Sequence, residues 1–379
     1  MIPYGKQIIS QQDIDSVVEV LNSDFITQGP KVKQFEYKMA AYCDVKHSVA
    51  VNSATSALHI ACLALGVTQG DTVWTVPNSF VASANCGLYC GASVDFVDIS
   101  LSTGNMCADK LEEKLLNSNV IPKAVIPVHF AGQSCDMARI YKLSQQFGFK
   151  IIEDASHAVG ARYKDKPVGS CEFSDICVFS FHPVKIVTTA EGGMALTNNK
   201  KLAERLELFR SHGVTRDPDL MTIEDAEPWY YQQVELGFNY RMTELQAALG
   251  LSQLAQLDEF VQSRNRIADK YNQAFDKACI DYLSLETGNY SSYHLFVIKV
   301  PADQRSALFK HLRQNKIGVN VHYIPIHTQP FYQKLGFKSG QFPNAELYYS
   351  ECISIPLFPA LKGEEQTHII DTIKAYLCN

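Results

Sequence analysis

The chain has 379 residues, enough for two domains, and its composition (46% hydrophobic, 20% charged) is ordinary for a globular protein. A formal net charge of −6 provides no basic surface, which argues against nucleic acid and membrane partners. No apolar run has the length of a membrane span, and residues 1–6 lead into polar sequence without a signal-peptide pattern. Eleven cysteines without CxxC pairs or zinc-type Cys/His spacing predict free thiols in a reducing cytoplasm and no metal.

Short β-prone runs alternate with helical patterns over the first half of the chain. Strands are predicted at 48–51, 73–76, 94–97, 124–128 and 150–152, and helices near 53–65, 79–90, 108–116 and 136–146. Nearly continuous apolar strands separated by helices indicate an α/β fold with a mostly parallel central sheet flanked by helices. In such sheets, ligands bind at the carboxyl ends of the strands.

The second half of the chain has a different pattern. An acidic, turn-rich surface excursion is predicted at 215–232, followed by two long helices, 242–257 and 259–275. A smaller α+β C-terminal domain is expected, with strands near 295–300 and 319–321 and helices at 304–314 and 365–377. The predicted division is a large ligand-binding domain, 1–245, and a helical bridge with the small domain, 246–379.

A single lysine lies in the polar turn between two apolar strands. If Lys185 is partly buried among its hydrophobic neighbours, its pKa falls and it offers the neutral amine that Schiff-base chemistry requires. Taken alone, an ordinary solvated surface lysine is the better interpretation.

Other polar or aromatic residues follow predicted strands. Residues 52–56 (NSATS) open a helix, where backbone amides can hold a phosphate, although an ordinary N-cap has the same pattern. Asp154 is either a cap or the counter-ion of a protonated ring nitrogen, and Phe80 is a core residue unless a planar ligand lies beside it. His322 and His327 are five residues apart with a proline between them, which argues against a zinc site.

These features follow one another in an informative order. A phosphate-type helix start, an aromatic turn, a strand-end aspartate and a strand-flanked lysine on one α/β sheet are typical of a pyridoxal-phosphate enzyme. The chain also resembles, nearly end to end, the DegT/StrS family of nucleotide-sugar aminotransferases, which have the fold-type I architecture. The matching runs are 27–30 (TQGP), 153–157 (EDASH), 180–185 (SFHPVK), 191–193 (EGG), 210–213 (RSHG), 237–241 (GFNYR) and 322–325 (HYIP).

Within this family the chain is most similar to members that act in bacterial pseudaminic acid synthesis, through residues 52–58, 79–85, 188–193 and 248–253. Many relatives have Gly-Thr where this chain has Ala54-Thr55, which we interpret as a mark of the subgroup.

The resemblance implies pyridoxal 5'-phosphate as the cofactor and a role for each matching residue. Lys185 would bind the cofactor aldehyde and then move a proton between the cofactor and sugar carbons. Asp154 would pair with the ring nitrogen, and Asn239 would reach the phosphate of a neighbouring subunit, which implies a homodimer with shared active sites. The remaining implied residues are Phe80 stacked on the ring, His157 near the ring face or its oxygen, Ala54, Thr55, Ser56 and Ser180 on the phosphate, and His322, Tyr323 and His327 on the sugar nucleotide.

The implied reaction transfers the amino group of L-glutamate, leaving 2-oxoglutarate, to the C4 ketone of a UDP-linked 4-keto-6-deoxy-N-acetylhexosamine. The expected product is the altrosamine-type sugar. The gluco-configured epimer or another nucleotide 4-keto sugar stays open as a substrate, because sequence does not determine the face of amine addition.

Three other functions are alternatives to this reaction. Related sugar dehydratases replace the lysine with histidine, which Lys185 argues against. A non-catalytic sensor on this fold would lack the lysine or the aspartate, or carry a DNA-binding segment. An amino-acid aminotransferase requires an arginine for the α-carboxylate, and Arg305 and Arg313 lie on a helix predicted to be solvated.

Overall fold

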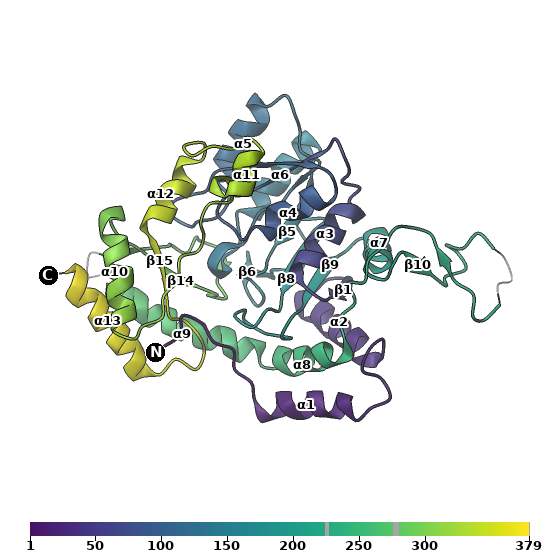
Figure 1. Ribbon diagram of the computed structural model, residues 1–379, viewed down its shortest axis with the longest axis horizontal. Coiled ribbons are helices and arrows are strands. Elements are labelled where there is room, and N and C mark those ends of the chain that lie inside the picture. Colours follow the sequence, from purple (N-terminus) through teal and green to yellow (C-terminus); the bar gives the residue numbers. More distant parts are fainter. Residues whose placement is uncertain (224–226, 276–279, 379) are drawn as a thin grey trace.

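The computed structural model describes residues 1–223, 227–275 and 280–378. At its centre is a seven-stranded sheet with the order β1-β9-β8-β5-β4-β2-β3 (Figure 1). Its strands are β1 (His47–Val51), β2 (Thr72–Thr75), β3 (Ser93–Phe96), β4 (Ala124–Val125), β5 (Lys150–Asp154), β8 (Ile176–Ser180) and β9 (Gly193–Thr197). Within this sheet the pairs from β8 to β3 are parallel, and β9 runs antiparallel to both of its neighbours. The prediction of a mostly parallel central sheet is confirmed.

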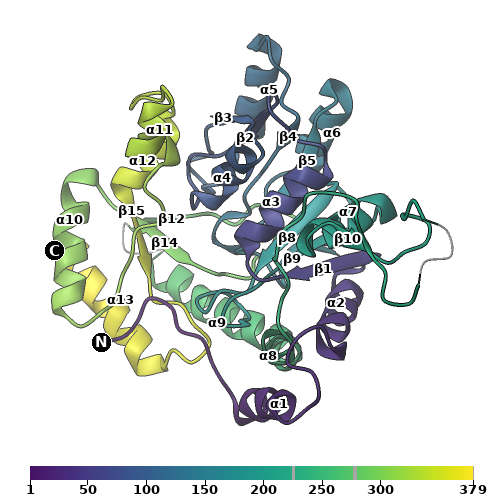
Figure 2. The ribbon, with the colours of Figure 1, turned by 45° about the vertical axis from the view of Figure 1, so that its right-hand side comes forward.

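Helices cover both faces of this sheet because its strands are apolar on both faces, and every residue of β8 and β9 is buried. One face packs against α3 (Ala54–Ala64), α4 (Ala82–Tyr89) and α7 (Lys200–Arg210). The other face packs against α2 (Pro30–Cys43), α5 (Ala108–Asn117), α6 (Met137–Phe147), α8 (Glu244–Leu254) and α9 (Leu257–Phe275). Helix α1 (Gln11–Leu21) lies against α8, outside these layers (Figure 2).

The C-terminal part contains a smaller antiparallel sheet, β12-β14-β15, covered by the end of α9 and by α10 and α13. Its elements are β12 (Asp281–Tyr282), β14 (Phe296–Lys299), α10 (Ala302–Gln314), η2 (Ile326–Thr328), α11 (Pro330–Lys334), α12 (Pro343–Glu351), β15 (Cys352–Ile355) and α13 (Gly363–Leu377). The chain's first residues lie here too, since Ile2 forms a bridge with Ile317 (Figure 1). The division into domains at residue 245 stays a prediction.

The strand predicted at 319–321 is wrong. The backbone there forms one isolated bridge, between Asn320 and Ser354. The Asn320 side chain accepts a hydrogen bond from the backbone N–H of Val321 (2.9 Å), and such local bonds compete with a ladder.

The strand predicted at 124–128 is also shorter than expected. Strand β4 ends at Val125, close to Pro127, which has no backbone N–H to donate to a ladder. Pairing resumes at Val128, which bridges Asp154 at the end of β5.

A hairpin of β10 (Val214–Thr215) and β11 (Gln232–Gln233) projects from the body where the surface excursion is predicted (Figure 1). Residues 224–226 of that excursion lie outside the described residues. A third small sheet pairs β6 (Arg162–Tyr163) with β7 (Lys166–Pro167) and β13 (Asn289–Tyr290), and η1 (Phe130–Gly132) follows β4.

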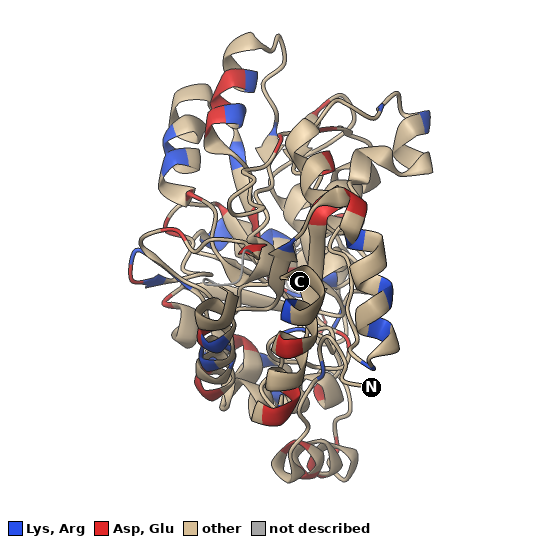
Figure 3. Ribbon diagram, turned by 90° about the vertical axis from the view of Figure 1, so that its left-hand side faces the viewer, with Lys and Arg blue, Asp and Glu red and all other residues tan. Residues whose placement is uncertain are grey.

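Acidic and basic residues are interspersed along the helices drawn in Figure 3. The ten cysteines in the described part of the chain are free thiols. None of the helices described is long and apolar enough to cross a membrane.

Candidate active site

A cavity of about 440 Å³ opens at the carboxyl ends of the parallel strands. Of the predicted site residues, nine line it: Ala54, Thr55, Phe80, Asp154, His157, Ser180, Lys185, His322 and Tyr323. We call the side that carries Lys185, Asp154, Phe80 and residues 53–55 the sheet wall, and the side that carries Tyr4, His294, His322 and Tyr323 the opposite wall. Ser56, Asn239 and His327 do not line the cavity.

The start of α3 forms one end of the sheet wall. Ser53 caps the helix by accepting a hydrogen bond from the Ser56 N–H (3.1 Å), and Ser56 Oγ donates to Asn52 Oδ1 (2.7 Å). Strand β9 passes so close that a Cβ on Gly193 would lie 2.5 Å from the Ala54 nitrogen, so only glycine fits there. Ser53, Ala54 and Thr55 at the start of α3 therefore line the cavity. The backbone N–H groups at a helix start are suited to binding a phosphate.

Asp154 is the last residue of β5, and its carboxylate is fixed. Oδ2 accepts a hydrogen bond from Ser83 Oγ (2.6 Å), while Oδ1 accepts from the Ser156 N–H (3.1 Å) and Oγ (2.6 Å). The carboxylate is nearly buried, with 4% of the residue exposed. A fixed, nearly buried anion at the cavity can hold a protonated ring nitrogen.

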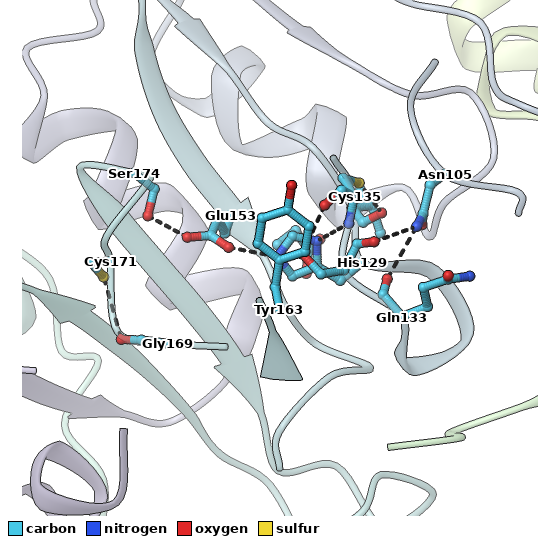
Figure 4. Close-up of polar contacts among 12 residues, drawn as sticks. Asn105, His129, Gln133, Cys135, Glu153, Tyr163, Gly169, Cys171 and Ser174 are labelled. Carbon is cyan, nitrogen blue, oxygen red and sulfur yellow. Dashed lines mark hydrogen bonds and ion pairs between the residues drawn. The ribbon is translucent and has the colours of Figure 1, made fainter. Parts of the chain in front are cut away.

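A second network fixes the backbone on the far face of β5 (Figure 4). The backbone N–H of His129 donates to the backbone carbonyl of Asp154 (3.0 Å). The ring nitrogen Nε2 of His129 lies 2.6 Å from Glu153 Oε2. Since His129 Nδ1 accepts from the Cys135 N–H (3.2 Å), Nε2 carries the proton and donates to Glu153. Ser174 Oγ donates to the other carboxylate oxygen, so the end of β5 is held from both faces.

Lys185 lies in the turn after β8 and lines the same wall of the cavity as Asp154. No hydrogen bond or ion pair of its Nζ is found within the described parts of the chain. Burial lowers the pKa of Lys185 to about 8, against the opposing influence of Asp154. This favours the neutral-amine interpretation over the solvated surface lysine.

Phe80 follows β2 and leaves 61% of its surface exposed, although it lines the cavity. The core interpretation of Phe80 is therefore not supported. An aromatic face held at the cavity is available to stack on a planar ligand.

His157 and Tyr323 meet at the cavity although they are 166 residues apart. His157 Nδ1 accepts from the Ala131 N–H (3.3 Å), so the neutral ring carries its proton on Nε2, which donates to Tyr323 Oη (3.1 Å). Burial holds the pKa of His157 well below its ordinary value, and Lys185 and His322 act in the same direction. The hydroxyl hydrogen of Tyr323 is thereby left for another acceptor.

His322 is held by its own partners. Its Nδ1 lies 2.8 Å from Ser354 Oγ, and Nε2 lies 3.3 Å from Asn320 Nδ2. Burial lowers the pKa of His322 to about 3, so the ring is neutral in the physiological range.

Three predicted residues lie elsewhere. His327 is fully buried, with Nε2 2.8 Å from Glu346 Oε1, and this position does not favour contact with a sugar nucleotide. Ser56 serves the helix start from behind the cavity wall, and Asn239 is exposed near the β10–β11 hairpin, where it forms a bridge with Ser211.

Sequence reasoning missed several lining residues that come from distant segments. Tyr4 precedes the first helix, and His294 directly precedes a predicted apolar strand, so neither has a local pattern that marks a ligand site. The further lining residues are Ser53, Leu58, Ser79, Ala82, Ser83, Val128, Ser156, His182, Val184 and Glu191. Nowhere in the described residues do three His, Cys, Asp or Glu side chains form a group suited to a metal ion.

The sheet wall fits pyridoxal phosphate. It presents an unpaired lysine for the aldehyde, a fixed carboxylate for the ring nitrogen, an aromatic face for the ring, and the start of α3 for the phosphate.

The model of the DegT/DnrJ/EryC1/StrS aminotransferase family matches residues 7–374. The chain belongs to this family. The family prediction and the prediction of an aminotransferase are therefore confirmed.

Two relatives of this DegT-family chain carry informative names. It is 38% identical over 381 residues to the UDP-4-amino-4,6-dideoxy-N-acetyl-β-L-altrosamine transaminase of Campylobacter jejuni, covering 100% of this chain and 98% of the relative. Helicobacter pylori PseC, an aminotransferase of pseudaminic acid biosynthesis, has a similar structure (TM-score 0.92, 32% identity, 99% of each chain).

A third relative bears on the cofactor. The putative sugar aminotransferase Spr1654 of Streptococcus pneumoniae superposes with a TM-score of 0.89 at 31% identity, covering 99% of this chain and 98% of that one. It has been solved in a PLP form and in a PMP form. These similarities confirm the fold-type I prediction.

Proposed function

We propose that the chain is a pyridoxal-phosphate aminotransferase that moves the amino group of L-glutamate to the C4 ketone of a UDP-linked 4-keto-6-deoxy-N-acetylhexosamine. The product would be UDP-4-amino-4,6-dideoxy-N-acetyl-β-L-altrosamine, a precursor of pseudaminic acid. One observation carries this proposal: Lys185 and Asp154 line one cavity with the start of α3, in a chain that matches the named transaminase over its whole length. Glutamate as the donor is an expectation from the family.

The residues of the sheet wall have distinct tasks in this reaction. Bound pyridoxal phosphate supplies an electron sink for the carbon that loses its proton. Lys185 would hold the cofactor aldehyde through its neutral amine and would move a proton between the cofactor carbon and the sugar carbon. Asp154 keeps the ring nitrogen protonated, while Ala54, Thr55 and Ser180 hold the phosphate.

The opposite wall holds the sugar nucleotide. Tyr323 has a hydroxyl hydrogen to donate, and burial keeps its pKa above the ordinary value, so it stays protonated across the physiological range. His322 adds a neutral surface beside it. His157 orients Tyr323 and stands near the cofactor ring.

Assembly as a homodimer with shared active sites is part of the proposal. Asn239 is exposed and does not line the cavity of its own chain, which suits a residue that serves a neighbouring subunit. The exposed Trp229 and Leu236 of the β10–β11 segment provide apolar surface for such a contact. A cytoplasmic location stays a prediction.

A visible absorbance spectrum of the purified protein tests the proposal. We expect the band of bound pyridoxal phosphate to bleach on adding L-glutamate and to return on adding the UDP-linked 4-keto sugar, with NMR of the product separating the altro from the gluco epimer. Lys185→Ala should fold and hold the cofactor, yet turn over about 10²–10⁴-fold more slowly because proton transfer is lost. No band even with added pyridoxal phosphate would contradict the enzyme assignment and favour the sensor.

A further inference from the structure

Four histidines line the cavity: His182 is exposed, whereas His157, His294 and His322 are buried and differ in what their ring nitrogens contact. Both nitrogens of His157 and both of His322 have hydrogen-bond partners. For His294, the described residues provide no hydrogen-bond partner to either nitrogen, and Nδ1 is buried. Buried polar atoms are rarely left unpaired, because an unpaired atom has given up its hydrogen bonds to water without replacing them. His294 therefore has hydrogen-bonding capacity that the protein itself does not use.

The backbone that carries His294 is firmly held. Arg264 of α9 is buried, with 2% exposed, and its Nη1 donates to the carbonyls of Tyr293 (3.1 Å), His294 (3.4 Å) and Leu357 (3.1 Å). The ring of His294 lies 4.3 Å from that of His157, centroid to centroid. Since Nδ1 is enclosed by protein, Nε2 is the nitrogen left for a ligand in the cavity.

The charge state of this wall indicates the kind of ligand. Burial lowers the pKa of His294 well below its ordinary value, and His157, Lys185 and Arg264 act in the same direction, so the ring is neutral. No arginine, and no lysine except Lys185, lines the cavity within the described part of the chain. A dicarboxylate donor would require a cation here, whereas the hydroxyl, carbonyl and acetamido groups of a sugar suit a neutral imidazole.

We propose that His294 binds the sugar ring of the nucleotide-linked substrate through a hydrogen bond at Nε2. This inference rests on the proposed function and adds to it a residue that discriminates the acceptor sugar from the amino donor. The wall opposite Lys185 then recognises the uncharged sugar ring by dipoles alone, through the hydroxyls of Tyr4 and Tyr323 and the imidazole of His294.

Separate measurement of the two half-reactions tests this proposal. Stopped-flow absorbance follows the cofactor with glutamate alone and then with the UDP-linked 4-keto sugar alone. In His294→Phe we expect the glutamate step to stay within about two-fold of wild type, and the specificity constant for the sugar step to fall about ten-fold or more through weaker binding. His294→Gln, whose amide can reach the Nε2 position, should retain more of the sugar step than His294→Asn, whose amide lies nearer Nδ1.

The controls distinguish a wrong assignment of His294 from a wrong proposed substrate. His368→Gln, on the exposed face of α13, should match wild type in both steps. A wild type that reacts with glutamate and not with the sugar refutes the proposed substrate, and the assignment of His294 falls with it. If the wild type reacts with both substrates, equal losses in the two steps of His294→Phe, or no loss in either step, contradict the assignment of His294. The proposed substrate then still stands. If His294→Phe does not fold, equal sugar-step rates in the Gln and Asn variants overturn it.

Discussion

The sheet wall and the opposite wall of the cavity are built on different principles. The sheet wall presents a carboxylate, an amine and a helix start, each at the carboxyl end of a strand or just beyond it. The opposite wall presents neutral rings, since burial lowers the pKa of His322 to about 3 and that of His294 well below its ordinary value. The residues of the opposite wall lie at the start of the chain and in its C-terminal part.

This difference divides the work of recognition. A cofactor with a phosphate, a ring nitrogen and an aldehyde requires charges and an amine, and the sheet wall holds Asp154 in place with three hydrogen bonds. The sugar ring of the substrate is uncharged, unlike its diphosphate, so the part of the opposite wall that meets this ring needs only well-placed donors and acceptors and avoids the cost of burying ions. Substitutions in the sheet wall should affect both half-reactions, whereas those in the opposite wall should affect only the sugar step.

After Lys185→Ala, Asp154→Asn should produce the largest effect on the sheet wall. The ring nitrogen loses its charge partner, so we expect both half-reactions to slow by roughly 10²-fold or more. Stopped-flow absorbance with glutamate alone and with the sugar alone measures the two steps. The amide oxygen can keep the two hydrogen bonds from Ser156, and the amide NH2 can donate to Ser83 Oγ in place of the bond that Asp154 accepts, so the thermal unfolding midpoint should change little. Unchanged rates in both steps would mean that a different acid holds the ring.

The ease of predicting each wall from sequence follows from how it is built. Asp154 and Lys185 are visible because a parallel sheet brings the carboxyl ends of its strands to one edge, so their order along the chain already places them together. Phe80 and the start of α3 follow from the same rule.

The opposite wall depends on contacts between distant segments, which local patterns do not contain. Tyr323 is positioned by His157 from 166 residues away. His327, four residues after Tyr323, was expected at the sugar but is turned inward at η2 onto Glu346. The strand predicted at 319–321 is reduced to a single bridge between Asn320 and Ser354 of β15, because the Asn320 side chain accepts the Val321 N–H locally.

The pH dependence of the reactivity of the Lys185 amine is a second test of the contrast between the walls. A lysine lowered to a pKa of about 8 is charged below that pH and neutral above it, so its reactivity rises about ten-fold per pH unit up to pH 8 and then levels. Ordinary lysines, with a pKa near 10.4, continue to gain reactivity above pH 8. We expect the ratio of labelling at Lys185 to labelling at surface lysines to be constant below pH 8 and to fall above it.

Benzaldehyde with cyanoborohydride provides this measurement on cofactor-free protein, with peptide mass spectrometry to locate each labelled lysine. The ratio cancels any effect of pH on the reagent itself. A ratio that stays constant up to pH 10 would show that Lys185 titrates as an ordinary surface lysine.

Ser83→Ala is expected to have the smallest effect, and it separates a positioning residue of the sheet wall from a binding residue of the opposite wall. Ser83 Oγ donates to Asp154 Oδ2 (2.6 Å), and Ser79 Oγ lies 2.7 Å from Ser83 Oγ. Ser79→Ala is therefore a matched control, because Ser79 is one hydrogen bond further from Asp154. We expect Ser83→Ala to slow both half-reactions by about ten-fold and to shift the pH at which the bound cofactor's absorbance titrates, because one hydrogen bond to the carboxylate is lost. Ser79→Ala should cost less than about three-fold, since the bond to Asp154 persists. A loss confined to the sugar step, or equal losses in the two variants, would contradict a role for Ser83 in positioning Asp154.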